Sequence, residues 1–322
     1  MTTAEFIQEY REKDTRQLAL QSARFPDVDM PYALDQIKGW QTARRKLPTW
    51  AACDGIVYPP HLSMEQCSSE PTAQYKLHLA MEWARRVDHA SSMTDLTGGF
   101  GVDFSFTSCA FASATYVERN AQLCHMVEHN LPLLGIDNAK VVCADAVDYL
   151  STLDMQTMIF LDPARRDQHG AKTVMLADCT PDVVQLLPQL LKKSCFTMLK
   201  LSPMLDWHKA VEDLHGTVRE VHIVSVGGEC KELLLVLSEE IESELKVFCA
   251  DLEAGGGSGG SSRSSGSSCS SLSSEPSFPR TPSSPSAPSN ASLFVYTPGS
   301  SRPAPNSKLK TQNSCMSPTP QS

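Results

Sequence analysis

The sequence predicts an α/β fold in which helices cover both faces of a mostly parallel sheet. Between residue 93 and about residue 238, short apolar runs typical of buried strands alternate with segments of helical periodicity. Such alternation indicates parallel strands joined by crossover helices. We expect strands at 93–97, 114–118, 140–143, 157–162, 195–201, 217–226 and 231–237, and helices at 101–110, 120–134, 181–193 and 204–214.

The last two expected strands are joined only by residues 227–231, Gly-Gly-Glu-Cys-Lys. A parallel crossover needs a dozen or more residues, so this link requires an antiparallel hairpin. The sequence therefore predicts seven strands, of which the last is antiparallel to its neighbours.

A glycine-rich turn follows the first expected strand, in the segment Asp95–Asp103, DLTGGFGVD. Its spacing is G-G-x-G, not the G-x-G-x-x-G of dinucleotide sites, and an acid precedes the glycines. An acid there disfavours a pyrophosphate but can bind the cationic amino-acid group of S-adenosylmethionine. Glu118 ends the next strand about 20 residues later, where a carboxylate accepts hydrogen bonds from ribose hydroxyls in Rossmann-like sites. The alternative is an ordinary strand–turn–helix corner.

Acids also end the third and fourth expected strands, at the sheet edge where ligands bind in α/β folds. Asp145 is placed to accept a hydrogen bond from an adenine amine, or to cap the next helix. Asp162-Pro163 should emerge beside the glycine turn, where Asp162 would hold a methyl acceptor or act as a base. Arg165 and Arg166 follow; they would pair with a phosphate or carboxylate, or with Asp167 or Asp178.

The segments on either side of the α/β region have different compositions. Residues 1–65 read as a helical domain, with a Thr2–Glu5 capping box and a helix from about Pro31 whose basic end would match the helix dipole or touch phosphates. Ser69 would cap the helix that precedes the first strand, and that helix would cover a ligand. We place the α/β domain at 66–252. The Ser/Pro-rich segment 253–322 should be disordered, either as a native tail or as the product of a slipped reading frame.

Bulk composition restricts the function classes. The 322 residues carry a formal net charge of −9, which argues against a globally basic nucleic-acid-coating surface but not against a local basic groove. The 11 cysteines include no C-x-x-C pair, so we expect reduced thiols and no metal site. The N-terminus has no apolar core of a signal peptide, and no segment approaches the ~18 apolar residues of a membrane span. We expect a cytoplasmic protein without membrane contact; its oligomeric state stays open.

These motifs resemble the successive motifs of class I S-adenosylmethionine-dependent methyltransferases. More narrowly, EQCSSEPTAQYK, DLTGGFGVD, LDPARR, KLSPMLD and GGECKELL resemble a bacterial family that has a helical N-terminal region and a C-terminal THUMP-like domain. The resemblance implies S-adenosylmethionine as cofactor and, since THUMP modules bind RNA, a tRNA or rRNA substrate. The Ser/Pro-rich segment stands where the THUMP-like domain should be. The alternatives are a non-catalytic binding protein with this fold, or a methyltransferase for a protein or small molecule.

The resemblance also implies roles for individual residues. The expected cofactor-binding residues are Asp95, Thr97, Gly98, Gly99, Gly101, Asp103, Glu118, Asp145 and Ala146. The expected catalytic residues are Asp162, Pro163 and Arg165, and the expected substrate-binding residues are Arg166, Ser69 and Lys200.

Overall fold

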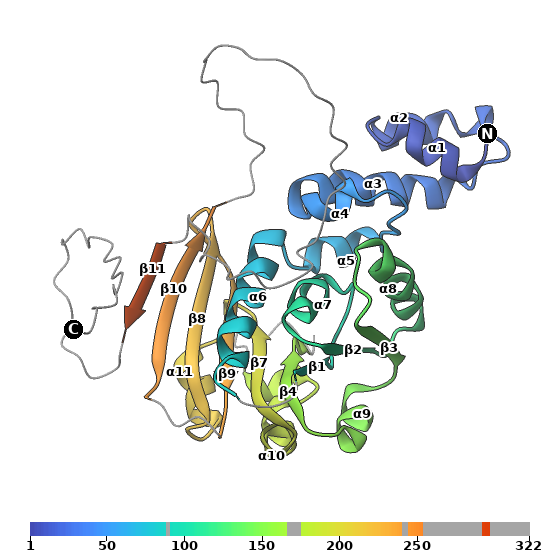
Figure 1. Ribbon diagram of the computed structural model, residues 1–322. Coiled ribbons are helices and arrows are strands. Elements are labelled where there is room, and N and C mark those ends of the chain that lie inside the picture. Colours follow the sequence, from blue (N-terminus) through green and yellow to red (C-terminus); the bar gives the residue numbers. More distant parts are fainter. Residues whose placement is uncertain (88–90, 166–174, 240–243, 254–291, 297–322) are drawn as a thin grey trace, which may run out of the picture.

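The protein is built on one twisted sheet in the order β11-β10-β8-β9-β7-β4-β1-β2-β3 (Figure 1). The computed structural model describes residues 1–87, 91–165, 175–239, 244–253 and 292–296. The sheet strands are β1 Ser92–Asp95, β2 Ser113–Glu118, β3 Ala139–Cys143, β4 Gln156–Leu161, β7 Ser194–Leu201, β8 Val218–Val226, β9 Glu229–Leu237, β10 Lys246–Leu252 and β11 Ser292–Tyr296.

The expected hairpin is confirmed. β9 lies between β7 and β8 and is antiparallel to both, whereas β3, β2, β1, β4 and β7 pair in parallel. Gly227 and Gly228 make the turn with φ of 58° and 79°, a left-handed conformation that glycine adopts without strain. The order of these seven strands brings the ends of β1 and β4 together at the centre of the sheet.

The sheet has two more strands than the seven expected. β10 pairs in parallel with β8, and β11 pairs antiparallel with β10. β10 was missed because its short sequence, KVFCADL, gives a weak strand pattern away from the rest of the sheet. β11 falls inside the segment expected to be a disordered tail, so residues 292–296 correct that expectation. The remainder of the segment lies outside the described residues.

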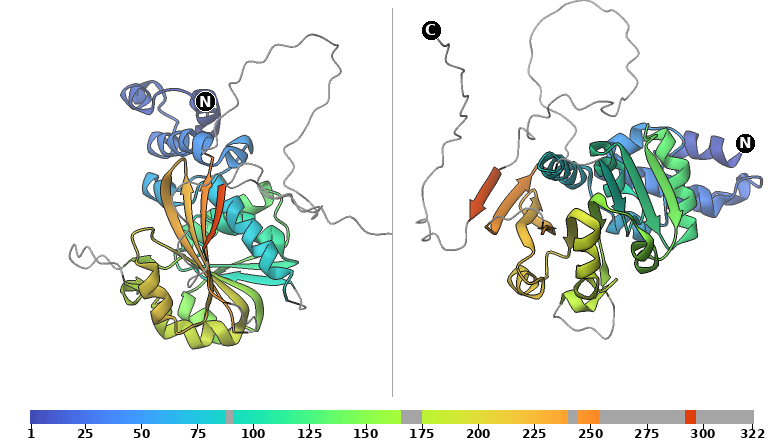
Figure 2. Two further views of the ribbon diagram at one scale, coloured as in Figure 1. Left: turned by 90° about the vertical axis from the view of Figure 1, so that its left-hand side faces the viewer. Right: turned by 60° about the horizontal axis from the view of Figure 1, so that its bottom comes forward.

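Helices cover both faces of the sheet, and Figure 2 shows α6 on one face and α10 and α11 on the other. One core packs Trp83 and Val127 against strand residues such as Met158, and the other packs Leu150 and Leu190 against the opposite side. The two cores explain why the inner strands are apolar on both faces. The first face carries α6 Glu70–Ala84, α7 Val102–Thr107 and α8 Ala121–Leu133; the second carries α9 Ala146–Thr152, α10 Val183–Lys193 and α11 Trp207–Asp213.

The N-terminal region is helical, as expected, and has its own small core around Phe6, Leu18 and Ile37. The Thr2–Glu5 capping box is present. The second helix, α2, ends at Leu20, and a short 3-10 turn, Ser22–Arg24, follows it. The helices are α1 Thr3–Tyr10, α2 Thr15–Leu20, α3 Met30–Lys46, α4 Pro48–Ala52 and α5 His61–Gln66.

A buried polar group fastens α6 and the turn after it to β8. Trp83 Nε1 donates to Glu220 Oε2 at 2.8 Å, and Arg86 donates to Oε1 at 3.0 Å. Tyr75 and His222 form a neighbouring hydrogen bond of 2.8 Å. Burial by itself would raise the pKa of Glu220, but hydrogen bonds from His222, Trp83 and Arg86 outweigh it and lower that pKa to about 2. The carboxylate is therefore part of the attachment of α6 to the sheet.

None of the helices in the described ranges is long and apolar enough to cross a membrane. None of the nine cysteines in the described residues is in a disulfide.

Candidate functional site

A cleft of about 1100 Å³ lies at the carboxyl ends of β1, β2, β4 and β7. This is the edge at which open α/β sheets bind ligands. Its floor is the glycine turn between β1 and α7, and side chains of α5 such as Ser63 and Gln66 contribute another wall. The expected residues that line it are Asp95, Thr97, Gly98, Gly99, Gly101, Asp103, Glu118, Asp145, Ala146, Asp162, Pro163 and Lys200.

The glycine turn rests on a tyrosine that the sequence interpretation missed. A Cβ on Gly98 would lie 2.1 Å from Cε2 of Tyr116, so only glycine fits against that ring. The Tyr116 hydroxyl donates to the carbonyl of Gly99. Gly99 and Gly101 have φ of 54° and 81°, the left-handed region. Tyr116 therefore supports the turn from below, while the turn's residues line the cleft above.

Two carboxylates flank this turn. Asp95 is buried, and its Oδ1 accepts from the backbone N–H of Thr97 at 2.9 Å. Burial raises the pKa of Asp95 well above its usual value; the Thr97 N–H opposes the shift, and Asp103 and Asp162 add to it. Glu118 is held by two backbone donors, Gly99 at 3.1 Å and Asn120 at 2.9 Å. A carboxylate has about four lone-pair sites, so Glu118 retains acceptor capacity toward the cleft.

Asp145 fulfils the capping alternative. Its Oδ1 accepts from the backbone N–H groups of Val147 and Asp148, at 2.8 and 3.4 Å, and so starts α9. Asp145 and Ala146 also line the cleft on the side of β3. Capping and ligand binding are compatible because both cap bonds use one carboxylate oxygen.

Beneath the cleft lies a buried network of charges centred on Asp103. Lys76 Nζ lies 2.5 and 2.7 Å from the two carboxylate oxygens of Glu232 and 3.1 Å from Asp103 Oδ1. Ser68 donates to Asp103 Oδ2 at 2.7 Å. Lys200 Nζ lies 3.3 Å from the same oxygen. The network therefore links α6, α7, β7 and β9.

The ionisation of the network follows from its mutual attractions. Burial opposes charge on Asp103, but the ammonium groups of Lys76 and Lys200 outweigh it and lower its pKa. Burial likewise opposes charge on Lys200, yet Asp162, Asp103 and Glu232 raise its pKa well above the usual value. Burial raises the pKa of Glu232 despite its contact with Lys76. This end of the cleft has four carboxyl groups, those of Asp95, Asp103, Asp162 and Glu232, and two ammonium groups, those of Lys76 and Lys200. The excess of carboxyl groups favours a cationic ligand.

Asp162 is fixed beside the glycine turn, at the end of β4. Its backbone N–H donates to Thr97 Oγ1 at 2.6 Å, which joins the end of β4 to the glycine turn. Lys200 donates to its Oδ2 at 2.6 Å, and the side chain is 39% exposed. Pro163 lines the cleft beside it. The structure thus places Asp162 in direct contact with Thr97 of the expected cofactor turn.

Four residues expected at the site either have another position or role in the structure or lie outside its described part. Arg165 belongs to the short strand β5 Ala164–Arg165, which pairs with β6 Cys179–Thr180, and its side chain lies outside the described residues. Arg166 lies outside them as well. Ser69 occupies the N-cap position before α6, but its side chain makes no cap bond and does not line the cleft, whereas Ser68 lines it. Lys200 lines the cleft, but its ammonium is engaged by Asp162 and Asp103.

Sequence reasoning missed Ser68, Lys76, Tyr116 and Glu232. A signal existed for the lysine, because Lys76 lies on the helix face of Ala73 and Ala80, which are also buried. A signal existed for Glu232 as well, since it begins the apolar run of β9. Neither residue's partner is visible in the sequence, since 156 positions separate them.

Comparison with solved structures agrees with the fold. A candidate methyltransferase from Porphyromonas gingivalis W83 is 29% identical, with a TM-score of 0.64 over 76% of this chain and 60% of that protein. The chain thus spans about 60% of that protein's length. An S-adenosylmethionine-dependent methyltransferase from Agrobacterium tumefaciens is 15% identical (TM-score 0.38, covering 51% of this chain and 61% of that one). An rRNA methylase from Streptococcus thermophilus is 13% identical (TM-score 0.39, covering 51% and 96%).

A scan against protein-family models and a search of curated proteins found no match. The strand order, the antiparallel β9, the glycine turn at the end of β1 and the similarity to the Porphyromonas protein point the same way. The chain therefore has the fold of the class I S-adenosylmethionine-dependent methyltransferases.

Proposed function

We propose that this protein is an S-adenosylmethionine-dependent methyltransferase that acts on RNA. The observation that carries the proposal is the glycine turn that packs on Tyr116, with Asp95 and Glu118 on either side and Asp162 beside it in the same cleft. The turn supplies bare backbone, the carboxylates supply acceptors, and Asp162 supplies a polar group where a methyl acceptor would lie.

The residues present fit the cofactor. Asp95 is a buried carboxyl group that accepts a hydrogen bond from the backbone N–H of Thr97, so an ammonium group would complete its surroundings. Asp103 Oδ1 lies at ion-pair distance from Lys76 yet lacks a hydrogen bond among the described residues. Glu118 would hold the ribose hydroxyls through its remaining lone pairs, and the segment Asp145–Ala146 would border the adenine.

S-adenosylmethionine would supply a methyl group on a positively charged sulfonium. The chain's contribution is alignment, because a methyl transfer is an in-line displacement that depends on the approach of the acceptor. Thr97 and Lys200 together fix the backbone and one carboxylate oxygen of Asp162. Asp162 would then hold the acceptor group through its exposed edge and accept its proton. Pro163 restricts the backbone just after it.

The RNA substrate is supported by the resemblance to the family with a THUMP-like domain. Acidic side chains outnumber basic ones among the residues that line the cleft, which disfavours a phosphate deep inside it. An RNA would therefore present a base to the cleft and keep its backbone outside. The cytoplasm is the compartment in which such a substrate would be met.

Calorimetric titration with S-adenosylmethionine tests the cofactor assignment. Asp95→Asn should weaken binding at least about tenfold, because a charge-assisted hydrogen bond contributes roughly 1.5–3 kcal/mol. Asp162→Asn should keep the affinity and lose turnover. Asp148→Asn, one turn into α9, is the matched control and should change neither. Equal affinities for wild-type protein and Asp95→Asn would reject the assignment of this carboxylate.

The RNA assignment needs its own measurement. Modified nucleosides in tRNA and rRNA should be compared by mass spectrometry between cells that carry the gene, cells that lack it, and cells that carry Asp162→Asn. A methylated nucleoside present only with the wild-type gene would support the proposal. Identical nucleoside profiles, together with methyl transfer to a ribonuclease-treated extract, would instead indicate a protein or small-molecule acceptor.

A further inference from the structure

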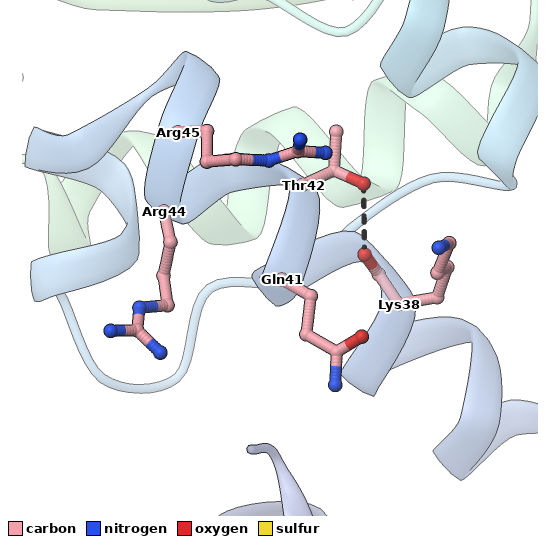
Figure 3. Close-up of a pocket in the computed structure, with 5 residues that line it drawn as sticks. All are labelled: Lys38, Gln41, Thr42, Arg44 and Arg45. Carbon is pink, nitrogen blue, oxygen red and sulfur yellow. Dashed lines mark hydrogen bonds between the residues drawn. The ribbon is translucent and has the colours of Figure 1, made fainter. Parts of the chain in front are cut away.

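A hollow of about 470 Å³ on helix α3 is lined by Lys38, Gln41, Thr42, Arg44 and Arg45 (Figure 3). Helix α3 carries four basic side chains and one acid, Asp35, and so has a formal charge of +3, whereas the whole chain has −9. Lys38, Arg44 and Arg45 are exposed. A local basic concavity on an acidic protein is a feature that the catalytic cleft does not use.

The dipole of α3 does not account for all of these cations. Dipole effects fall off within the last turn of a helix, and Lys38 lies two turns before the end of α3 at Lys46. Lys46 has a structural role, because its ammonium donates to the carbonyls of Met64 and Glu65 at 2.9 and 2.7 Å. Within the described residues, neither Lys38 nor Arg45 lies within 4.0 Å of a carboxylate oxygen. Their charges are available to a ligand.

Neighbouring contacts fix the shape of the hollow. Thr42 Oγ1 donates to the carbonyl of Lys38 at 3.0 Å, and Gln41 Nε2 donates to the carbonyls of Arg11 and Lys13. The guanidinium groups of Arg11 and Arg44 lie 4.6 and 5.0 Å from the centre of the Trp40 ring. The acids facing these arginines are Asp54, 3.2 Å from Arg11, and Glu12, 3.4 Å from Arg44.

The helix that carries the hollow, α3, contacts α5, which forms one wall of the cleft. Lys46, the last residue of α3, is bonded to α5, and Ser63 and Gln66 of α5 line the cleft. Leu62 on the same short helix is 67% exposed. A chain of phosphodiesters bound on α3 could therefore pass over α5 and place a base at the cleft. The acidic cleft would reject the phosphates, and the basic hollow would hold them.

We propose that the hollow formed by Lys38, Arg44 and Arg45 binds the phosphodiester backbone of the RNA substrate and orients it toward the cleft. The inference rests on the proposed function. Guanidinium and ammonium groups bind phosphate oxygens without reading sequence, so the hollow positions the RNA and does not select it.

The test uses the full chain and a fluorescein-labelled RNA hairpin, with affinity measured by anisotropy across salt concentrations. Lys38→Glu/Arg45→Glu should weaken binding by about tenfold at low salt and reduce the slope of log affinity against log salt by about 1.5. The matched control, Arg16→Glu/Arg24→Glu, makes the same kind of change at exposed sites of α2 and the turn after it. The control should bind RNA as the wild type does. Circular dichroism verifies that both variants are folded.

Equal RNA affinity and equal salt slope for the two double variants would overturn the inference. It would also be overturned if the protein bound no RNA but bound phosphatidylserine vesicles, and Lys38→Glu/Arg45→Glu abolished that vesicle binding. The parallel titration with S-adenosylmethionine separates this inference from the proposed function. Neither double variant touches the cleft, so both should bind the cofactor normally. Loss of RNA binding with intact cofactor affinity would support the hollow, whereas absent cofactor binding in the wild type would reject the proposed function alone.

Discussion

Replacing Lys76 by methionine should destabilise the protein through a charge left without its partner. Lys76 is fully buried, and its ammonium contacts both oxygens of Glu232, which is itself only 3% exposed. Breaking a buried ion pair costs about 3–5 kcal/mol, because the remaining charge is neither solvated nor paired. Asp103 keeps Lys200 at 3.3 Å after the change, so the stranded carboxylate is that of Glu232. We therefore expect a loss near the lower end, about 3 kcal/mol.

Urea denaturation followed by circular dichroism measures this loss, and a double-mutant cycle assigns it. Lys76→Met/Glu232→Gln removes both members of the pair and should recover at least about 1.5 kcal/mol relative to the sum of the single variants. Lys209→Met is the control: this exposed lysine pairs with Glu212 and Asp213 on the surface of α11. Its loss should be within about 0.5 kcal/mol of zero.

The reasoning would be refuted by additive losses in the cycle, or by a Lys76→Met variant that unfolds at nearly the wild-type urea concentration. Either result would mean that Glu232 finds water or another cation when Lys76 is absent. A loss confined to cofactor affinity, with unchanged stability, would likewise show that the lysine acts on the glycine turn and does not hold α6 to the sheet.

Three further predictions follow from single residues. Gly98→Ala should destabilise the protein by about 1–3 kcal/mol because its Cβ would clash with Tyr116. Gly99→Ala should cost about 1 kcal/mol, because its Cβ would make only an ordinary contact and the cost comes from the φ of 54°; comparison of urea midpoints checks the order. Because burial raises the pKa of Asp95 well above its usual value, the group stays neutral to higher pH than an ordinary aspartate, so affinity for the cationic cofactor should rise as pH increases above the usual aspartate range, and a flat calorimetric profile would exclude this. The pKa of Glu220 is about 2 in the folded protein against 4.5 for an ordinary glutamate, so the stability that it contributes is complete above pH 4.5 and is lost as pH falls toward 2. The difference of roughly 3 kcal/mol in unfolding free energy between wild type and Glu220→Gln should shrink over that pH range in urea titrations.

The elements that could be predicted are those with a local signal. The seven strands of the central sheet followed from apolar runs and from the five-residue link before β9, which leaves only one pairing direction. The N-terminal capping box needs contacts only three residues apart. By contrast, α2 stops at Leu20 and β10 was missed, because weak periodicity does not fix where an element ends or whether an edge strand forms.

The candidate site likewise contains residues that the strand pattern predicts and residues whose role only the folded chain decides. Asp95, Glu118, Asp145 and Asp162 could be placed because each ends a strand or lies just after one, and the ends of parallel strands share one edge of the sheet. Ser68 could not be distinguished from Ser69, because a shift of one residue decides which hydroxyl meets Asp103. The role of Lys200 changed for a similar reason: only the folded chain brings Asp103 and Asp162 to the same ammonium.

The amino-acid sequence by itself determined which segments form the sheet, where the chain turns on glycine and which acids end the strands, since these depend on periodicity and on neighbours within a few residues. The tertiary structure alone decided that Tyr116 supports the turn, that Lys76 neutralises Glu232 and that α3 carries an open basic hollow. The physical reason is that packing and the pairing of buried charges join residues far apart in the chain, and their energies depend on distances that no local pattern contains.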